Sequence, residues 1–315
     1  MATNGERETL ILPDAYSVGR ITVYREGERE PSEFLDARGI VHVPKSSKLF
    51  LDLSQDVCDD LRAVHSVPGS LLVNGISISE RNLARTDFRE LFPLHLCSLA
   101  ITSCNGLRPE QLQQLGNLSS LEHLNLDRTP IENPDFSWVS QLANLRTLLL
   151  SGTGAGGTCI PFLAGLHRLE DLHLADCKIS DHDAQAIWRF VGMKAVNLGK
   201  CPITDRALEG IGRSSVLASL SVPDTGISDE GVETLVAEAL RTGQKLNFLT
   251  LRSCRITDKA LVRLASLSSL TFIDLYGTEV TPEGASFLKK SLSECRIFVG
   301  RDKGGGPKLW QVERA

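Results

Sequence analysis

The chain has 315 residues, of which 42% are hydrophobic, so it is long enough to bury a large core in one to three domains. Its formal net charge of −5 is opposite to the basic balance of nucleic-acid and anionic-membrane binders, and we expect neither partner. The first residues are polar with no apolar signal segment behind them, and no run reaches the length of a membrane span. We therefore expect a cytoplasmic protein.

The first 47 residues are predicted to form β-structure. Residues 17–24 and 39–44 have the composition of strands, and a charged turn around residues 26–31 separates them. Repeated units follow, and the first unit of a stacked array has an open sheet edge and an uncovered core end. We therefore assign residues 1–47 as an N-terminal β cap. A separate ligand-binding β domain is the alternative.

From residue 96 to 294 a leucine-spaced phrase recurs about every 24 residues, which is the length typical of one strand and one short helix. Its positions 1, 4 and 6 are apolar, and positions 4 and 6 alternate in the manner of a strand. Behind the next apolar residue stands a serine or threonine, as Thr257 follows Ile256, and this is typical of a helix start. The phrase begins at Leu96, Leu121, Leu145, Leu169, Met193, Leu217, Leu246 and Leu270.

One strand and one short helix cannot bury their own apolar face, whereas stacked copies can. The pattern predicts an α/β solenoid with a parallel sheet on the concave side and short helices on the convex side. The extra length of one copy, at residues 230–242, predicts a longer helix. The copy starting at Leu145 has glycines where helix-start residues usually stand, and we expect an irregular segment there. Residues 296–299 predict a last strand.

The phrase LxxLxLxx(C/T)xI(T/S)D resembles the cysteine-containing leucine-rich repeats of bacterial proteins and of F-box adaptors. It is complete at Cys177, Cys201, Thr225 and Cys254. The resemblance implies a horseshoe-shaped leucine-rich-repeat solenoid. It covers residues 96–294 strongly and 48–95 as degenerate copies, so we expect repeats over 48–299 and a C-terminal cap or tail over 300–315.

Position 9 of the phrase is a cysteine or a threonine in every copy. A thiol or hydroxyl is a small donor suited to satisfying backbone groups inside the turn. Cys177 and Cys201 stand in adjacent copies at a spacing compatible with a disulfide, yet threonine replaces cysteine in the same column. We therefore predict structural reduced thiols. The remaining cysteines, Cys58, Cys97, Cys159 and Cys295, have no metal-binding spacing.

Motifs for catalysis or cofactors are weak. Residues 152–157 fit GxGxxG, but Thr153 stands at position 9 and the next strand begins on schedule at Leu169. Neither HExxH, GxSxG nor a paired CxxC is present. We expect no cofactor, no metal and no enzymatic activity.

The exposed positions of the last two strands carry an unusual group of side chains. Phe248, Phe272, Tyr276 and Arg252 are predicted to stand together on the concave face, where most other positions are small or polar. Aromatic residues and arginine are enriched in binding hot spots. The alternative is that the C-terminal segment, including Trp310, folds over them.

A second group of candidates is polar. Strand spacing puts His123 and His173 roughly 10 Å apart, which is too far for one zinc ion. A peptide-binding surface or a merely solvated face remain as interpretations. The group comprises His123, Asn125, Asp127, Arg128, Asp171 and His173.

The exposed strand positions of successive copies line up to form a long open surface, and no group of catalytic residues converges on it. This combination predicts a non-catalytic scaffold that binds a partner protein on its concave face. A substrate-recognition adaptor of an enzyme complex, for example of ubiquitin-ligase type with catalysis supplied in trans, is the alternative. A purely structural role in a larger assembly is a third possibility. The partner itself is not identified by the sequence.

Overall fold

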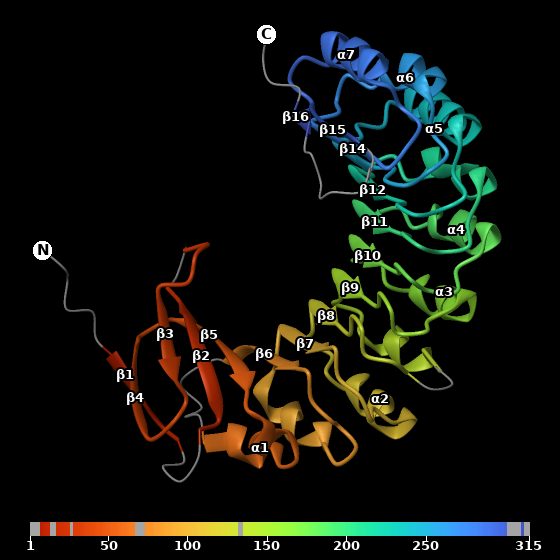
Figure 1. Ribbon diagram of the computed structural model, residues 1–315. Helices are drawn as coiled ribbons and strands as arrows, with labels where there is room; N and C mark the ends of the chain where they lie inside the picture. Colours follow the sequence, from red (N-terminus) through yellow and green to blue (C-terminus); the bar gives the residue numbers. More distant parts are fainter. Residues whose placement is uncertain are drawn as a thin grey trace, which may run out of the picture. The chain divides into compact units, whose positions relative to one another are not determined.

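Figure 1 shows the fold of the chain in a computed structural model. The chain forms two compact units, Met1–Leu149 and Leu150–Ala315. The structure describes residues 7–12, 17–25, 28–66, 73–131, 135–300 and 310–311.

The first unit begins with antiparallel β-structure. Strand β1 (Arg7–Ile11) pairs with β4 (Ile40–Pro44) as a separate two-stranded sheet. Strand β2 (Gly19–Tyr24) lies between β3 (Glu33–Asp36) and β5 (Lys48–Leu53) and is antiparallel to both. Strand β5 then pairs in parallel with β6 (Val73–Ser79), so β2 and β3 continue the sheet of the repeats within this unit.

Both strands predicted before residue 47 are present, but the segment between them contains one strand that was not predicted. Of the charged turn predicted around residues 26–31, residues 26–27 lie outside the described residues, and residues 28–32 lead into β3. Strand β4 pairs with β1 rather than with β2. Strand β3 has only four residues, with Phe34 exposed and charged residues at both ends. A short edge strand of this kind lacks the alternation by which a half-buried strand is detected.

The rest of the first unit consists of parallel strands joined by short helical segments. The strands follow one another in chain order: β6 (Val73–Ser79), β7 (Ser98–Thr102), β8 (His123–Asn125) and β9 (Thr147–Leu149). The α-helices are α1 (Gln55–Cys58) and α2 (Pro109–Leu115), and the 3-10 helices are Leu61–Ser66, Phe88–Leu94 and Ser137–Gln141.

The second unit repeats this design more regularly. Its parallel strands are β10 (Asp171–His173), β11 (Ala195–Asn197), β12 (Ser219–Ser221), β13 (Phe248–Thr250), β14 (Phe272–Tyr276) and β15 (Arg296–Gly300), and β16 (Trp310–Gln311) pairs antiparallel with β15. The helices are α3 (Ile160–Leu163), α4 (Asp181–Ile187), α5 (Asp229–Thr242), α6 (Asp258–Leu264) and α7 (Pro282–Ser291), with 3-10 helices at Gly157–Cys159, Asp205–Leu208 and Ile211–Arg213.

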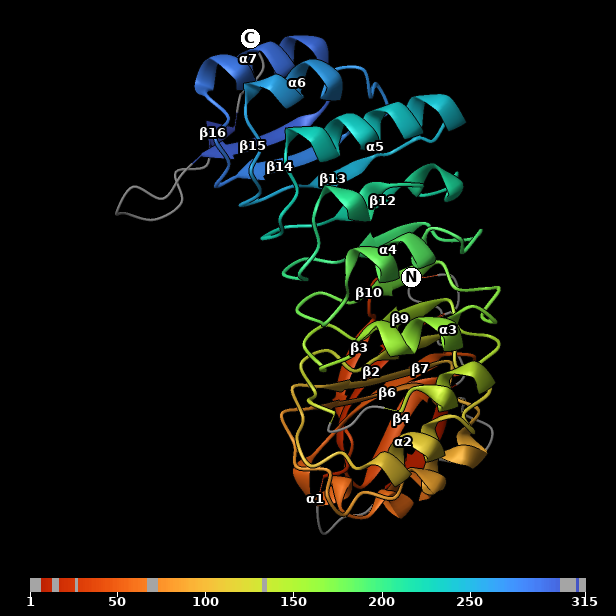
Figure 2. The same cartoon turned by 90° about the vertical axis from the view of Figure 1, so that its right-hand side faces the viewer.

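Figures 1 and 2 show that the helices of the second unit lie along one face of its sheet. Among the residues that the structure describes in this unit, no helix lies on the other face, which we call the open face. The predicted α/β solenoid with a parallel sheet is confirmed. So are the longer helix, which is the 14-residue α5, and the last repeat strand, β15. The irregular segment predicted after the strand at Leu145 consists of one 3-10 turn and the four-residue α3.

The repeat phrase has a constant backbone geometry. Positions 1, 4 and 6 are buried, as Leu246, Leu249 and Leu251 illustrate. Position 8 is left-handed even where it is not glycine, with φ at 54° in Asp176. Glu80 occupies the same position of the degenerate copy that starts at Val73, and its φ is 59°. This agreement shows that the degenerate copy makes the same turn as the regular ones.

The position-9 side chains bind backbone carbonyls inside the solenoid. The Cys201 thiol donates to the Leu174 carbonyl of the preceding copy at 3.1 Å. The Thr278 hydroxyl donates to the Leu275 carbonyl of its own copy at 2.6 Å. All eight cysteines are free thiols. The predicted use of this column, to satisfy buried backbone oxygens, is confirmed by these contacts.

The position-9 thiols and their buried neighbours are expected to resist alkylation. Burial raises the pKa of Cys201 to about 11 and that of Cys159 to about 12, so almost none of either thiol is ionised near pH 8. Seven cysteines are buried and Cys97 is half-buried. We expect a thiol reagent at pH 8 to modify Cys97 alone in the native protein and all eight cysteines in denaturant. Cys97→Ser is the control, and fast modification of further thiols in that variant contradicts the expectation.

The helix-start signature links successive repeats. Ser228 caps α5, and both its backbone N–H and its hydroxyl donate to the Asp205 carboxylate of the preceding repeat, at 2.7 and 2.6 Å. Thr257 binds Asp229 in the same way, at 2.8 and 2.6 Å. The aspartate after each serine or threonine therefore accepts hydrogen bonds from the cap of the following repeat. The sequence motif predicted the cap but not this link between repeats.

Candidate functional site

Three phenylalanines form a row across the last strands of the second unit, and we call them the phenylalanine strip: Phe248, Phe272 and Phe298. Phe248 of β13 lies opposite Phe272 of β14, with ring centroids 6.1 Å apart and planes tilted by 34°. Phe298 of β15 lies 5.1 Å from Phe272 at 40°. These are favourable separations for offset aromatic pairs. Phe248 is 51% exposed, so the row ends in a ring that solvent reaches.

Phe298 was not among the predicted site residues. It stands two residues after Arg296 in β15, at the place that Asp274 takes in β14. The leucine phrase is incomplete in this last copy, because Glu294 stands where position 1 is usually a leucine. Extending the strand register by one copy was the signal that could have found Phe298.

Arg252 is held in place beside the strip. Its Nε donates to Asp274 Oδ2 at 3.0 Å, and its guanidinium carbon lies 5.0 Å from the centroid of the Tyr276 ring. This distance is within the range of a cation–π contact. The other carboxylate oxygen of Asp274 accepts the Tyr276 backbone N–H at 2.9 Å. Asp274 is only 7% exposed, whereas the Arg252 side chain is 50% exposed.

Asp274 is the second functional residue that was missed. A carboxylate is rarely buried unless it is paired, and its pairing with Arg252 explains why it is tolerated here. By the alternation of a strand, Asp274 lies on the same face as Phe272 and Tyr276, but the direction in which its side chain bonds depends on the neighbouring strand. The structure thus brings Phe248, Phe272, Tyr276 and Arg252 together as predicted, and adds Asp274 and Phe298 to them.

The predicted polar group is divided between the two units. In the first unit, His123 Nδ1 lies 3.0 Å from Thr147 Oγ1 on the next strand. Asn125 Oδ1 accepts the backbone N–H of Asp127 at 2.8 Å, so this amide shapes its own turn. Arg128 is exposed and stands at the left-handed position of that turn, with φ at 57°.

In the second unit, His173 Nε2 lies 3.1 Å from Asp171 Oδ1 on the same strand. Among the residues that the structure describes, no group of three or more histidines, cysteines or carboxylates is placed to hold a metal ion. Within the same residues, no helix is both long and apolar enough to cross a bilayer. The described contacts of these polar residues are local to each unit: His123 with Thr147 and Asn125 with Asp127 in the first, and Asp171 with His173 in the second.

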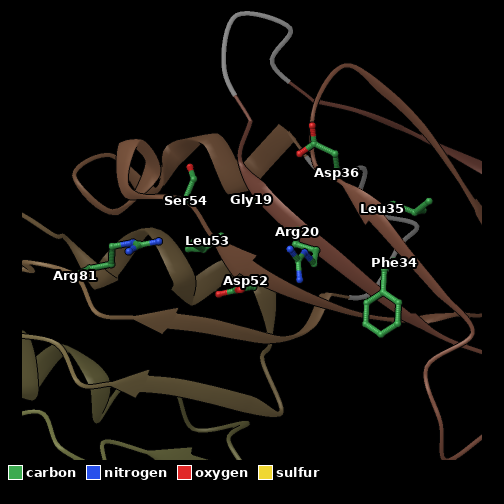
Figure 3. Close-up of a pocket in the computed structure, with 9 residues that line it drawn as sticks. All are labelled: Gly19, Arg20, Phe34, Leu35, Asp36, Asp52, Leu53, Ser54 and Arg81. Carbon is green, nitrogen blue, oxygen red and sulfur yellow. The ribbon is translucent and has the colours of Figure 1, made fainter.

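A pocket of about 490 Å³ lies in the first unit, between β2, β3, β5 and the start of the repeats (Figure 3). Arg81 enters it from position 9 of the copy that starts at Val73, where the regular copies have cysteine or threonine. The two arginines and two aspartates of the lining sum to zero charge. The pocket is lined by Gly19, Arg20, Phe34, Leu35, Asp36, Asp52, Leu53, Ser54 and Arg81.

Sequence reasoning missed this pocket because β3 was not predicted. Within it, the Ser54 hydroxyl donates to the Ser17 carbonyl at 2.7 Å, and the Ser17 hydroxyl donates to Asp36. These bonds join Ser17, just before β2, to Asp36 of β3 and to Ser54, just after β5. Most of the residues that line the pocket therefore belong to the β-structure formed by β2, β3 and β5.

Comparisons with known proteins agree with the fold. A family model described as Leucine Rich repeat matches residues 166–187. An internalin (inlF) from Listeria monocytogenes is similar in structure over 84% of this chain and 91% of its own, with 16% sequence identity and a TM-score of 0.52. Internalin C2 from the same organism covers 70% of this chain and 87% of its own, at 20% identity and a TM-score of 0.49. No protein with a curated function matches the sequence.

The repeat phrase, the stacked parallel strands and the matched segment agree on the fold. The chain has the fold of a leucine-rich-repeat solenoid, and its residues 166–187 match the leucine-rich-repeat model. Since 420 chains of known structure match it, the fold alone does not define a partner.

Proposed function

We propose that this protein is a non-catalytic scaffold that binds a partner protein on the open face of the second unit's sheet. The observation that carries the proposal is the phenylalanine strip beside an arginine held by Asp274 and Tyr276. Aromatic side chains and arginine, clustered and surrounded by weaker contacts, are the usual composition of a binding hot spot.

The surroundings of the strip support binding to an extended surface. Repeat solenoids present a continuous face on which each strand contributes the same positions. Towards β10 these positions are small or polar, as at Ala195, Ser219 and Ser221, so a partner can approach the backbone there. Asp171 and His173 lie on the same face and are proposed as polar rim contacts.

The polar residues of the first unit are proposed as a second, weaker contact region. His123 is exposed on its strand, and Arg128 is exposed in the following turn. Asn125 and Asp127 are assigned the supporting role of shaping that turn, because they bond to each other. Rim contacts of this kind contribute specificity more than affinity.

Two further assignments accompany this function. The β-segment before residue 47 is proposed to be a cap, and its continuation of the repeat sheet through β2 and β3 supports this. A reducing compartment such as the cytoplasm is proposed as the location, and the free thiols buried in the repeats support it.

Affinity capture from native lysate tests the binding face. The wild-type protein is compared with a variant carrying alanine at Phe248, Arg252, Phe272 and Tyr276. A control variant carries Val262→Ala and Phe287→Ala, two exposed apolar side chains on α6 and α7. We expect the control to retain the captured protein and the strip variant to lose it. Equal capture by both variants argues against this face, and the identity of the captured protein separates a scaffold from an enzyme adaptor.

A further inference from the structure

We propose that the partner segment bound by this face carries acidic side chains on either side of an apolar anchor. The anchor lies on the phenylalanine strip, and the carboxylates pair with Arg252 and Arg296. This inference rests on the proposed function and adds to it the chemistry of the partner.

Arg252 is held in one orientation by Asp274 and Tyr276. Asp274 accepts from Nε, and the Tyr276 ring lies against the guanidinium, so the group is oriented before any partner arrives. Among the described residues, no acceptor for its two terminal amino groups is found. Since the side chain is half exposed, these donors are available in the fork geometry that matches a carboxylate. Little side-chain entropy is then lost on binding.

A second arginine, Arg296, lies beside the strip. It pairs in register with Phe272, so it stands next to the central ring of the strip. Its side chain is exposed. Arg252 follows the end of β13, whereas Arg296 begins β15, so the two residues stand towards opposite ends of the parallel strands that carry the strip. A partner that crosses Phe272 passes between them.

The local charge of the strands also favours an acidic partner. Strands β13, β14 and β15 contain one acidic residue, Asp274, which is 7% exposed and already paired. The charge exposed on these strands is that of Arg296, and Arg252 adds a second positive charge in the turn after β13. Asp224, whose backbone N–H donates to the Arg252 carbonyl, is an exposed carboxylate in the adjacent turn, so the exposed charge of this region is positive by one, in a chain whose formal net charge is −5. A positive patch selects a negative partner and increases the rate of encounter with it.

The net charge of the chain favours a protein segment over a nucleic acid as the partner. Aromatic rings with arginine can also stack on the bases of a single-stranded nucleic acid. Such binding depends on neutralising many phosphates, and the acidic balance of this chain opposes it. A protein segment with two or more acidic side chains and an aliphatic or aromatic anchor requires only the two arginines and the strip.

Synthetic peptides test the proposal directly. Three peptides of about 11 residues share a central leucine–phenylalanine pair and differ only in flanking glutamate, glutamine or lysine residues. Binding of fluorescent peptides to the full chain is measured by anisotropy. We expect the glutamate peptide to bind about tenfold more tightly than the glutamine peptide, and the lysine peptide to bind most weakly. Raising the salt concentration from about 50 to about 300 mM weakens the glutamate peptide most.

Matched variants assign the effect to residues. Arg252→Gln and Arg296→Gln are each expected to reduce the preference for glutamate over glutamine while leaving the glutamine peptide unchanged. Arg252→Lys retains part of the preference because it keeps the charge. Phe272→Ala weakens all three peptides alike. Thermal unfolding of each variant confirms that the fold is retained.

The proposal is overturned if the glutamate and glutamine peptides bind equally, if the lysine peptide binds best, or if none binds. It is also overturned if an oligothymidine probe binds in a Phe272-dependent way, or if the strip mediates self-association seen in light scattering. In each of these cases the proposed function is retained if the wild-type protein still captures a partner from lysate and the variant with the strip replaced by alanine does not. If capture is also independent of the strip, both proposals fail.

Discussion

Replacing Trp188 by alanine is expected to lower the free energy of unfolding by about 3–5 kcal/mol. Trp188 follows α4 and is fully buried. Its indole Nε1 donates to the Ala207 carbonyl of the next repeat at 2.6 Å. The substitution therefore leaves a cavity and also removes a bond between repeats. In a solenoid, stability is approximately a sum of repeat and nearest-neighbour terms, so this loss falls on an interface between neighbours. Chemical denaturation measures it.

Two phenylalanine variants separate packing from hydrogen bonding. Trp188→Phe keeps most of the ring but leaves the Ala207 carbonyl without its donor, at an expected cost of about 1–3 kcal/mol. Trp138 is also fully buried, yet its Nε1 has no acceptor among the described residues. Trp138→Phe is therefore expected to cost less than Trp188→Phe. An equal loss in the two variants contradicts the role assigned to the bond between repeats.

Phe272→Ala is expected to weaken binding of the captured partner by about 2–4 kcal/mol, or roughly 30- to 1,000-fold in Kd. Phe272 is the central ring of the strip and contacts a phenylalanine on each side. Its removal takes away the anchor and also leaves Phe248 and Phe298 without their shared neighbour. Isothermal titration calorimetry with the purified partner measures the change.

Two comparisons make this result specific. Phe248→Ala removes an end of the strip and is expected to cost less than Phe272→Ala. Phe287 on α7 is 45% exposed, close to the 51% of Phe248, and it lies on the helix side of the unit. Phe287→Ala is therefore expected to leave Kd unchanged. A loss of similar size in all three variants points instead to a general weakening of the fold, and thermal unfolding of the free variants distinguishes the two.

Much of the architecture could be predicted because the repeat is local. Apolar residues at positions 1, 4 and 6 set the strand, and a serine or threonine followed by aspartate sets the helix start, all within about 24 residues. Strand β3 could not be predicted, since it is a short edge strand whose pairing depends on β2. The bonds from Asp205 to Ser228 were missed for a related reason. They join residues of different copies, and no single copy contains both partners.

The candidate site shows the same division. Phe248, Phe272, Tyr276 and Arg252 were predicted from the column positions of two strands, and the structure brings them together. Asp274 lies on the same face of β14 as Phe272. That its carboxylate orients Arg252 is known only from the structure, because the two residues belong to different copies. Whether a side chain faces solvent or bonds to another side chain depends on the residues of the neighbouring strands.

By itself, the sequence determined that this chain is a stacked leucine-rich-repeat solenoid, and which side chains form its buried ladder and which its exposed columns. It could do so because each repeat encodes its own strand, turn and helix start. Only the tertiary structure decided how the exposed side chains combine. Phe298 extends the row of phenylalanines, the buried Asp274 carboxylate binds Arg252, and the polar candidates make local contacts within their own unit, as His123 does with Thr147. The reason is that these contacts join side chains on different strands or in different copies, and their geometry exists only once the sheet has formed.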